Sequence, residues 1–581
     1  MILKHIPKLS VILLLSLLSF IHSSGLCQLN PGSVPVISNL TYDSITHTSV
    51  SVMWTTDFPS DSKIRWMKTD SNYQALAFTD SLFQAMAVTN HIVNIPNLEP
   101  AKIYKYHVLS MNVDGMSIDS GYFVTQSLST GQVDVYFNHS VDTSVSTGEF
   151  ANGNVNFANL FVEQIDSAKT SIDITLWGFS YYTSISDALI RAKNRGVRIR
   201  FVYDHTENTS LIDSLLKYDI PVQKRKFDTT YSMHNKFWVF DHRYNSNPNK
   251  QYLWTGSTNV SHPQFHSDKN NIIIIQDEAL CAIYTREFEE MWGSHTDLFD
   301  TIRARFGTQK KDNVPHILNV AGTRMEVYFS PSDSVSRFLS NLMLTKTTHS
   351  LFFCMLKFEL ADIEAALLSL HNSGKQIKGV FDLADCQLPN SAYPRMKGWP
   401  VANAWNPPAD VFTDSISGLI HHKYFITDAN TIFGNKIIST GSFNWEVPAD
   451  IGNDENSLTI FDARINNLYF QEFHSRYKES GGGNIVINGI QSEIPEKFRL
   501  WQNFPNPFSN TTTIRYELLA PVSVNMSIYD IHGRKIETLV NGRNDSGIHE
   551  IEWNASKYTS GVYYFRLTAN GFSITHKMIL I

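Results

Sequence analysis

The chain is poor in cysteine. Only four occur among its 581 residues, and Cys27 falls in an apolar N-terminal stretch. If that stretch is removed, Cys281, Cys354 and Cys386 remain. Three cysteines form at most one bridge, so disulfides do not define this fold.

Long apolar runs are also scarce. Two lysines precede an apolar run over residues 11–21, and small residues follow it. Because the run is short for a membrane span, this order predicts a secretory signal peptide over residues 1–28. A single membrane anchor is the alternative, while Leu26 before Cys27 is bulkier than a lipid-attachment site prefers. No later stretch is long enough to cross a membrane.

Neither sign of charge dominates. The 48 basic and 55 acidic residues give a formal net charge of -7, which provides no general attraction to nucleic acid or to an anionic membrane. A local positive site remains open. Hydrophobic residues make up 42% of the chain and charged residues 18%, an ordinary balance for globular protein, and the length predicts several domains.

Residues 33–128 alternate apolar and polar positions in short runs separated by turns, which predicts an all-β domain. Residues 49–54 (SVSVMW) are typical of a strand, and the sequence Leu98-Glu99-Pro100, followed by Tyr104 and Tyr106, has the spacing of a tyrosine corner. This region resembles a fibronectin type III domain. A carbohydrate- or partner-binding module and a simple spacer both remain open as its role.

Two stretches in the middle of the chain share one pattern of strand, helix and strand. In the first copy the strands are at 171–177 and 197–203 and the helix is at 185–195. In the second copy the strands are at 350–356 and 377–381 and the helix is at 363–370. Gly196 to Asp204 and Gly374 to Asp382 both span eight residues. The match predicts an internal duplication, with a first half over 134–300 and a second over 301–478. We therefore expect an α/β core of two mixed-sheet halves about a pseudo-twofold axis, flanked by all-β sandwiches.

Each half carries one reactive motif. Residues 234–241 read HNKFWVFD and 256–259 read GSTN; residues 421–428 read HHKYFITD and 441–444 read GSFN. Both copies are His-x-Lys-x-x-x-x-Asp followed by Gly-Ser-x-Asn. A chance match is credible for one copy but not for two.

The spacing within each motif separates its side chains. On a strand, His and Lys two positions apart share a face, whereas the Asp seven positions from the His points the other way and braces the strand end. An imidazole acts as nucleophile or general acid near neutral pH, and Lys and Asn donors stabilise a phosphate oxyanion. Two such sets place a His on each side of one phosphorus, with no metal or other cofactor required.

The duplicated motif resembles that of the phospholipase D superfamily over about residues 134–478. The resemblance implies a metal-independent phosphodiesterase that works through a covalent phosphohistidine, with the catalytic unit complete in one chain. It also implies His234 as nucleophile and His421 as general acid. The expected site residues are His234, Lys236, Asp241, Asn259, His421, Lys423, Asp428, Asn444 and Glu455.

A bracing carboxylate is expected in only one half. In related members a Glu after Gly-Ser-x-Asn braces a histidine, and Glu455 fits that place. The first half has Asn270 there instead, which leaves its bracing group open.

The C-terminal region reads as a separate small β-sandwich. Three glycines at 481–483 predict a flexible break within a linker over 479–499. Residues 500–581 carry the sequences NFPNPF, IYD and SGVYY, and they resemble the C-terminal sorting domain of the bacterial type IX secretion system. That resemblance implies the secretion machinery as a partner and export across an outer membrane, while the signal peptide would direct the crossing of the inner membrane, so the protein is expected to be secreted or held at the cell surface.

The leading hypothesis is a secreted phospholipase D-type enzyme that hydrolyses a phosphatidylcholine-like phospholipid to phosphatidate and an alcohol. A non-specific endonuclease of the same superfamily is the alternative within enzymes. The acidic total disfavours it, and the basic run 224–226 (KRK) favours it. A secreted adhesin or glycan-binding protein, with the N-terminal sandwich as its working part, is the alternative from another class.

Overall fold

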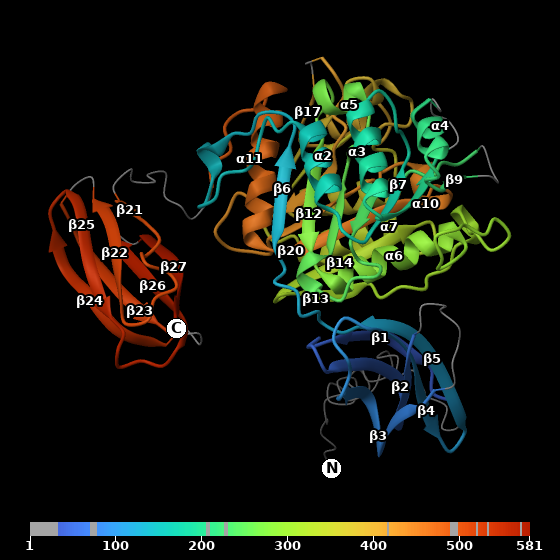
Figure 1. The fold of residues 1–581 in the computed structure, drawn as a ribbon, viewed down its shortest axis with the longest axis horizontal. Helices are drawn as coiled ribbons and strands as arrows, with labels where there is room; N and C mark the ends of the chain where they lie inside the picture. The colour runs from blue at the N-terminus through green and yellow to red at the C-terminus, as the bar shows by residue number, and fades with distance from the viewer. Residues whose placement is uncertain are drawn as a thin grey trace, which may run out of the picture. The chain divides into compact units, whose positions relative to one another are not determined.

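Figure 1 shows the computed structural model. It describes residues 33–69, 78–204, 210–225, 230–414, 417–487, 498–518, 521–530, 534–569 and 572–581. The predicted signal peptide and residues 488–497 of the predicted linker lie outside the described residues. Residues 433–485 and the described residues up to 429 belong to one compact unit, and residues 486–581 belong to a second. Among the described residues, no helix combines the length and the hydropathy needed to cross a bilayer.

The N-terminal domain of the first unit is all β. Its strands are β1 (Ile37–Asp43), β2 (Val50–Lys68), β3 (Asp80–Ile95), β4 (Ile103–Asn112) and β5 (Gly115–Val124). The long strand β2 pairs with β1 near its start, with β4 near its end, and with β3 along most of its length. The Tyr104 hydroxyl accepts a hydrogen bond of 2.9 Å from the Glu99 amide, which is the tie expected of a tyrosine corner.

The core of the first unit consists of two mixed sheets with the same strand plan. The first sheet has the order β6-β12-β11-β10-β7-β8-β9 and the second β13-β14-β20-β19-β18-β15-β16-β17. The first contains β6 (Val133–Phe137), β7 (Ser171–Leu176), β8 (Arg198–Tyr203), β9 (Val222–Lys224), β10 (Lys236–Phe240), β11 (Tyr252–Gly256) and β12 (Asn271–Gln276). The second contains β13 (Ile317–Val320), β14 (Thr323–Ser330), β15 (Ser350–Met355), β16 (Gln376–Phe381), β17 (Asp410–Thr413), β18 (Lys423–Thr427), β19 (Ile437–Gly441) and β20 (Glu455–Phe461). Apart from β13, each strand has a counterpart in the other sheet, so the predicted duplication is present.

The helices repeat in the same way. The first half contains α2 (Phe157–Ser167), α3 (Thr183–Asn194), α4 (Ser210–Lys217), α5 (His262–His266) and α6 (Glu278–Trp292). The second half contains α7 (Val335–Lys346), α8 (Ala361–Asn372), α9 (Tyr393–Met396), α10 (Val447–Ile451) and α11 (Ala463–Glu479). Short 3-10 helices lie at Thr143–Val145, Pro248–Lys250, Gly307–Gln309 and Asp385–Gln387. Gly196 after α3 and Gly374 after α8 have φ of +93° and +84°, the left-handed conformation that ends a helix.

Helix α6 differs from the sequence expectation. The spacing of Tyr284, Phe288 and Met291 predicts an amphipathic helix over residues 284–292, but the helix begins at Glu278 and is buried on nearly every side. Helix α11 is buried in the same way. Both contact strands of the two sheets, which explains why their polar residues are inside. There, buried charges are neutralised in pairs, such as Glu289 of α6 with Arg200 of β8.

The second unit is a small all-β domain. Its strands are β21 (Phe498–Leu500), β22 (Thr511–Leu518), β23 (Val522–Tyr529), β24 (Lys535–Asn544), β25 (Gly547–Asn554), β26 (Gly561–Ala569) and β27 (Phe572–Leu580). They form a three-stranded sheet, β21-β22-β25, and a four-stranded sheet, β24-β23-β26-β27. Ile514, Met526 and Phe565 are fully buried between strands of the two sheets. The expected fold class, a duplicated α/β core with all-β regions on either side, is confirmed.

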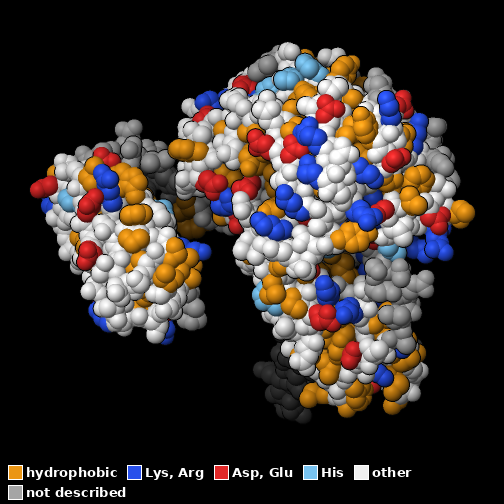
Figure 2. All heavy atoms as spheres, in the orientation of Figure 1, with side chains coloured by type: hydrophobic (Ala, Val, Ile, Leu, Met, Phe, Trp, Pro, Cys, Tyr) orange, Lys and Arg blue, Asp and Glu red, His pale blue; other side chains and the backbone are white. Residues whose placement is uncertain are grey.

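The surface of the core mixes both signs of charge. On the face shown in Figure 2, Lys and Arg side chains lie among Asp and Glu side chains, and no broad patch of one sign appears. The net charge of -7 is therefore not gathered on this face.

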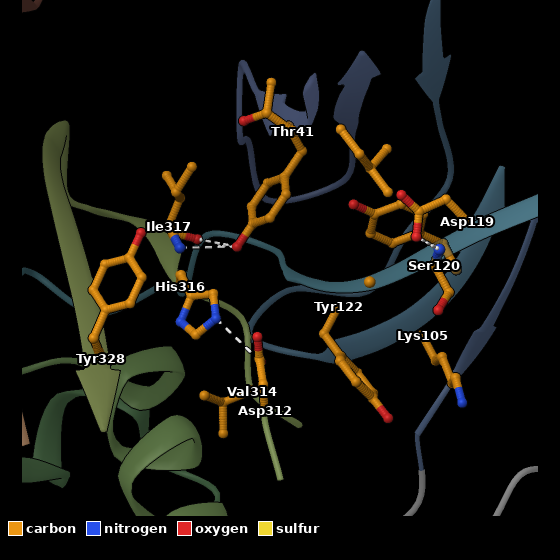
Figure 3. A pocket seen from close by; sticks show the side chains of 14 residues that line it. Thr41, Lys105, Asp119, Ser120, Tyr122, Asp312, Val314, His316, Ile317 and Tyr328 are labelled. Carbon is orange, nitrogen blue, oxygen red and sulfur yellow. Dashed lines mark hydrogen bonds and ion pairs between the residues drawn. The ribbon is translucent and has the colours of Figure 1, made fainter. Parts of the chain in front are cut away.

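The N-terminal domain meets the core at β13. The Tyr42 hydroxyl accepts from the Ile317 amide and donates to its carbonyl, both at 2.9 Å. A cavity of about 510 Å³ adjoins this contact (Figure 3). In it, His316 stacks on Tyr328 with ring centroids 4.4 Å apart and lies 3.1 Å from an Asp312 carboxylate oxygen.

Candidate active site

The two motif histidines stand at equivalent places, just before the central strands β10 and β18. His234 precedes β10, which lies between β7 and β11. His421 precedes β18, which lies between β15 and β19. A strand paired on both sides is held rigidly, so the backbone that carries each imidazole is fixed in position.

The residue before each histidine is anchored by an aspartate that the strand-helix-strand pattern places at a strand tip. The Met233 amide donates to Asp204 at 2.7 Å, and the Ile420 amide donates to Asp382 at 3.0 Å. These two aspartates belong to the positioning of the site, although the sequence indicated only that they end their strands.

The glycine of each Gly-Ser-x-Asn motif is required by a close backbone contact. Gly256 and Gly441 have φ of +147° and +145°. A Cβ at Gly256 would collide with the carbonyl oxygen of Asn271, and one at Gly441 with that of Asn456. Only glycine therefore lets β11 and β19 end tightly against their neighbouring strands.

Both histidines line one cavity of about 540 Å³. Asn259 and Asn444, from the ends of the two Gly-Ser-x-Asn motifs, line it as well. The structure thus brings together a His and an Asn from each half, from positions far apart in the chain.

Glu455 of the second half braces His234 of the first. Its Oε2 lies 2.8 Å from His234 Nδ1. Burial lowers the pKa of His234, while the Glu455 charge opposes that shift. Burial alone would raise the pKa of Glu455, but His234 and Lys236 outweigh it and hold that pKa below its usual value. A charged Glu455 therefore favours a proton on Nδ1, which leaves Nε2 free.

Asn270 of the first half braces His421 of the second. Its Oδ1 lies 2.9 Å from His421 Nδ1. The amide orientation is fixed because Nδ2 donates to the Gln264 carbonyl at 2.9 Å. Oδ1 must then accept from His421, so Nδ1 carries the proton and Nε2 is free. Burial and the nearby Lys423 hold the pKa of His421 well below its usual range.

The two motif lysines lie beside the histidines and behind the cavity wall. Lys236 Nζ donates to the His234 carbonyl at 2.8 Å, and Lys423 Nζ donates to the His421 carbonyl at 2.6 Å. Burial lowers the pKa of Lys236 to about 7 and the pKa of Lys423 well below its usual value. A bound anion would restore both charges, which is the behaviour expected of a phosphate site.

The two motif aspartates do not line this cavity. Asp241 accepts from the amides of Lys169 and Thr170, at 2.9 and 2.6 Å. Asp428 accepts from those of His349 and Ser350, at 2.7 and 3.0 Å. Their carboxylates hold the start of β7 and β15 through these hydrogen bonds.

Further cavity residues were not singled out from the sequence. Glu446 Oε1 accepts from Asn444 Nδ2 at 3.1 Å, and its other oxygen lies 2.9 Å from Lys357. The Trp177 ring stands edge-on to His234, with centroids 6.1 Å apart. The sequence signal for Glu446 was its place two residues after the motif asparagine; Trp177 directly follows the strand β7 that pairs with β10.

Comparisons with known proteins agree with this geometry. The chain matches the family described as "Cardiolipin synthase, PLD-like domain" over residues 161–292 and 342–477, and the "Secretion system C-terminal sorting domain" over 502–581. It is 29% identical over 138 residues to a mitochondrial cardiolipin hydrolase of Xenopus tropicalis, covering 24% of this chain and 59% of that one. It is 24% identical to a phospholipase D of Rickettsia bellii, covering 32% of this chain and 85% of that one.

Among solved structures, phosphatidylserine synthase of Haemophilus influenzae aligns with a TM-score of 0.40 at 12% identity, covering 56% of this chain and 84% of that one. The matches cover 59% and 56% of the lengths of the cardiolipin hydrolases of Xenopus tropicalis and Chlamydomonas reinhardtii, less than two thirds of each. Both family matches lie where the duplicated motif and the C-terminal β-domain are found. The chain therefore carries a duplicated phospholipase D-like domain, and its residues 502–581 match a secretion-system C-terminal sorting domain.

Proposed function

We propose that the protein is a secreted phosphodiesterase of the phospholipase D type that hydrolyses phospholipid. The observation that carries the proposal is the single cavity lined by both histidines, each held at Nδ1 by a group from the opposite half. In both rings Nε2 is then free to face a phosphorus held between them. A pair of facing imidazoles is what a two-step displacement at phosphorus requires.

In the first step, His234 Nε2 attacks phosphorus and forms a P–N bond. The bond to the head-group oxygen breaks, and His421, doubly protonated once the anionic substrate is bound, donates its Nε2 proton to that oxygen. Lys236, Lys423, Asn259 and Asn444 stabilise the negative charge on the phosphate oxygens. The products are a free alcohol and a phosphohistidine.

The bracing groups support His234 as the nucleophile. Phosphorylation makes its ring cationic, and Glu455 Oε2 at 2.8 Å stabilises that charge. His421 faces a neutral amide, and its pKa is held well below the usual range. Once the anionic substrate has charged it, such an imidazole gives up its proton readily.

In the second step, the neutral His421 removes a proton from water. The water oxygen attacks phosphorus, the P–N bond breaks, and phosphatidate leaves with His234 restored. An alcohol in place of water gives a transphosphatidylated lipid by the same step.

Three observations support lipid over nucleic acid as the substrate. Leu356, Leu419 and Pro448 line the cavity, and Leu419 is 37% exposed, so the lining is partly apolar. Arg225, from the basic run that favours a nuclease, is buried and paired with Asp454. The curated relatives are named as cardiolipin hydrolases and a phospholipase D.

The C-terminal sorting domain is the basis for the export route that we propose. The C-terminal sorting domain supports secretion or display at the cell surface through the type IX machinery. We propose that the N-terminal signal peptide directs the first membrane crossing and that the sorting domain takes no part in the chemistry.

The test incubates the purified protein with phosphatidylcholine vesicles, cardiolipin vesicles and plasmid DNA, each in EDTA. We expect phosphatidate from lipid that persists in EDTA and is lost in both His234→Ala and His421→Ala. Activity should rise when monomeric lipid aggregates. Cleavage of DNA alone, falling steeply with salt, would establish the nuclease. Absence of hydrolysis together with glycan binding unaffected by His234→Ala would establish the binding protein.

A further inference from the structure

Four buried charges lie on the contact face between the two halves of the core, which we call the seam. Arg225 and Lys269 belong to the first half, and Asp414 and Asp454 to the second. Arg225 Nη1 lies 2.9 Å from Asp454 Oδ2, and Lys269 Nζ lies 2.8 Å from Asp414 Oδ2. Their exposed fractions are between 0% and 5%, so neither pair is screened by water.

Two of these charges occupy equivalent positions after the edge strands. Arg225 follows β9 and its amide donates to the carbonyl of Tyr203, at the end of β8, at 3.1 Å. Asp414 follows β17 and its amide donates to the carbonyl of Phe381, at the end of β16, at 3.0 Å. The same backbone site thus carries a cation in the first half and an anion in the second.

The other two charges are equivalent as well. Lys269 directly precedes Asn270, and Asp454 directly precedes Glu455, the two groups that brace the histidines. Each also pairs across the seam with the motif histidine of the other half: the His234 amide donates to the Asp454 carbonyl at 2.9 Å, and the His421 amide to that of Lys269 at 3.1 Å.

Position for position, the first half is therefore cationic where the second half is anionic. Lys310, on the connection between the halves, adds a further cation 3.4 Å from Asp454 and also binds Glu287. The reversal is complete at both pseudo-equivalent pairs.

We propose that this charge reversal makes each half fit the other half and reject a copy of itself. If two first halves met about the same axis, Arg225 of each copy would face Lys269 of the other. Two second halves would bring Asp414 against Asp454. Buried like charges with too few counter-charges are strongly destabilising, and Lys310 beside Asp454 offsets only one of the two carboxylates, so the unlike pairing is favoured.

The selection also protects the asymmetry of the active site. Pairing of unlike halves gives one imidazole a carboxylate and the other an amide. Two like halves would give two carboxylates or two amides. Under the proposed function, the distinct roles of nucleophile and acid would then be lost; the charge reversal itself does not depend on that function.

The test reverses one pair in the full chain. Asp414→Lys puts two ammonium groups together inside the chain, and it also makes the second half self-complementary, because Lys at 414 fits Asp454 of a copy. Lys269→Asp puts two carboxylates together inside the chain and makes the first half self-complementary, because the new carboxylate fits Arg225 of a copy. The double variant Lys269→Asp with Asp414→Lys restores an unlike pair within one chain. The matched control reverses the exposed pair Asp166 and Arg191, whose atoms lie 2.6 Å apart on the surface.

Light scattering, melting temperature and phosphodiesterase activity are measured for each variant. We expect each single reversal to lower the melting temperature, to reduce activity about tenfold or more, and to populate a dimer absent from the parent. The double variant should recover the mass and melting temperature of the parent, and the surface reversal should change neither. Single variants that keep the parent's mass and melting temperature would overturn the proposal, as would a double variant no better than either single.

If Asp414→Lys does not yield soluble protein, Lys269→Asp carries the same test from the other half. Mass and melting temperature need no substrate, so they decide this proposal even if the enzyme assay finds no activity.

Discussion

Glu455 Oε2 lies 2.8 Å from His234 Nδ1, although the two residues come from opposite halves and stand 221 positions apart. The equivalent contact on His421 is made by the neutral amide of Asn270. The duplicated site is therefore symmetric in its backbone and asymmetric in the charge behind its two imidazoles. That difference assigns separate roles to two residues that their motifs leave identical.

Removing the charge of Glu455 should impair catalysis more than binding. In Glu455→Gln the side-chain shape is kept, but nothing neutralises the cationic ring of the phosphorylated His234. We expect kcat to fall by about 10²- to 10⁴-fold with a small change in KM, as for other groups that support a catalytic imidazole. Steady-state kinetics with a soluble diester measures the split. A rise in KM at constant kcat would contradict the bracing role.

Giving His421 a carboxylate should move one limb of the pH profile. In Asn270→Asp the new charge raises the pKa of His421, by about one unit or more. A general acid is active while protonated, so activity falls as pH rises through this pKa, and the alkaline limb should move to higher pH. The profile of kcat against pH checks this.

The same variant distinguishes the reverse assignment. Were His421 the nucleophile, it would act unprotonated, and Asn270→Asp would instead move the acidic limb. Ser261→Asp is the control, because Ser261 lines the same cavity but forms no described contact with either imidazole. A diester with a good leaving group should be less sensitive to the change, since its departure needs little help from an acid.

The sequence predicts the parts of the site that are local and repeated. His234 and Lys236 are two residues apart, and the Gly256 turn follows from a close backbone contact that recurs at Gly441. The strand-helix-strand units follow from apolar periodicity, and the duplication follows from the matching glycine-to-aspartate offsets.

The contacts between the halves could not be predicted from the sequence. Lys269 and Asp414 are paired only because two separate sheets meet, and no pattern along the chain records that meeting. Helix α6 fails as an amphipathic prediction for the same reason, because its polar residues are buried in contacts with other parts of the unit, such as Glu289 with Arg200 and Arg286 with Tyr122. Interactions that form only when the two halves pack together produce no periodic pattern in the sequence.

Neutralising the motif aspartates should affect stability and spare chemistry. Asp241 accepts from three backbone amides at the start of β7, and Asp428 accepts likewise before β15. Asp241→Asn or Asp428→Asn weakens these charged hydrogen bonds, and we expect a loss of about 1–3 kcal/mol in the free energy of unfolding. Denaturant unfolding measures it, with Asp187→Asn on the exposed face of α3 as the control. A folded Asp241→Asn that had lost its turnover would give that carboxylate a chemical role after all.

Binding of a phosphodiester should weaken as pH rises above neutrality. Burial lowers the pKa of Lys236 to about 7 in the free protein, and a bound anion raises it again. At a pH between the pKa of the lysine in the free protein and its raised pKa in the complex, binding of the anion is accompanied by uptake of a proton. The affinity should therefore fall about tenfold per pH unit for each lysine that is recharged. Lys423, whose pKa is also lowered by burial, should add to the slope.

Dimethyl phosphate is a suitable competitor because it stays a monoanion across this range, and its dissociation constant can be followed by calorimetry from pH 6 to 9. In Lys236→Arg the guanidinium is always charged, so we expect binding to persist while the slope loses about one proton. An unchanged slope in that variant would mean that Lys236 keeps its proton in the free protein. A flat profile for the parent would show that neither lysine is neutral before the anion arrives.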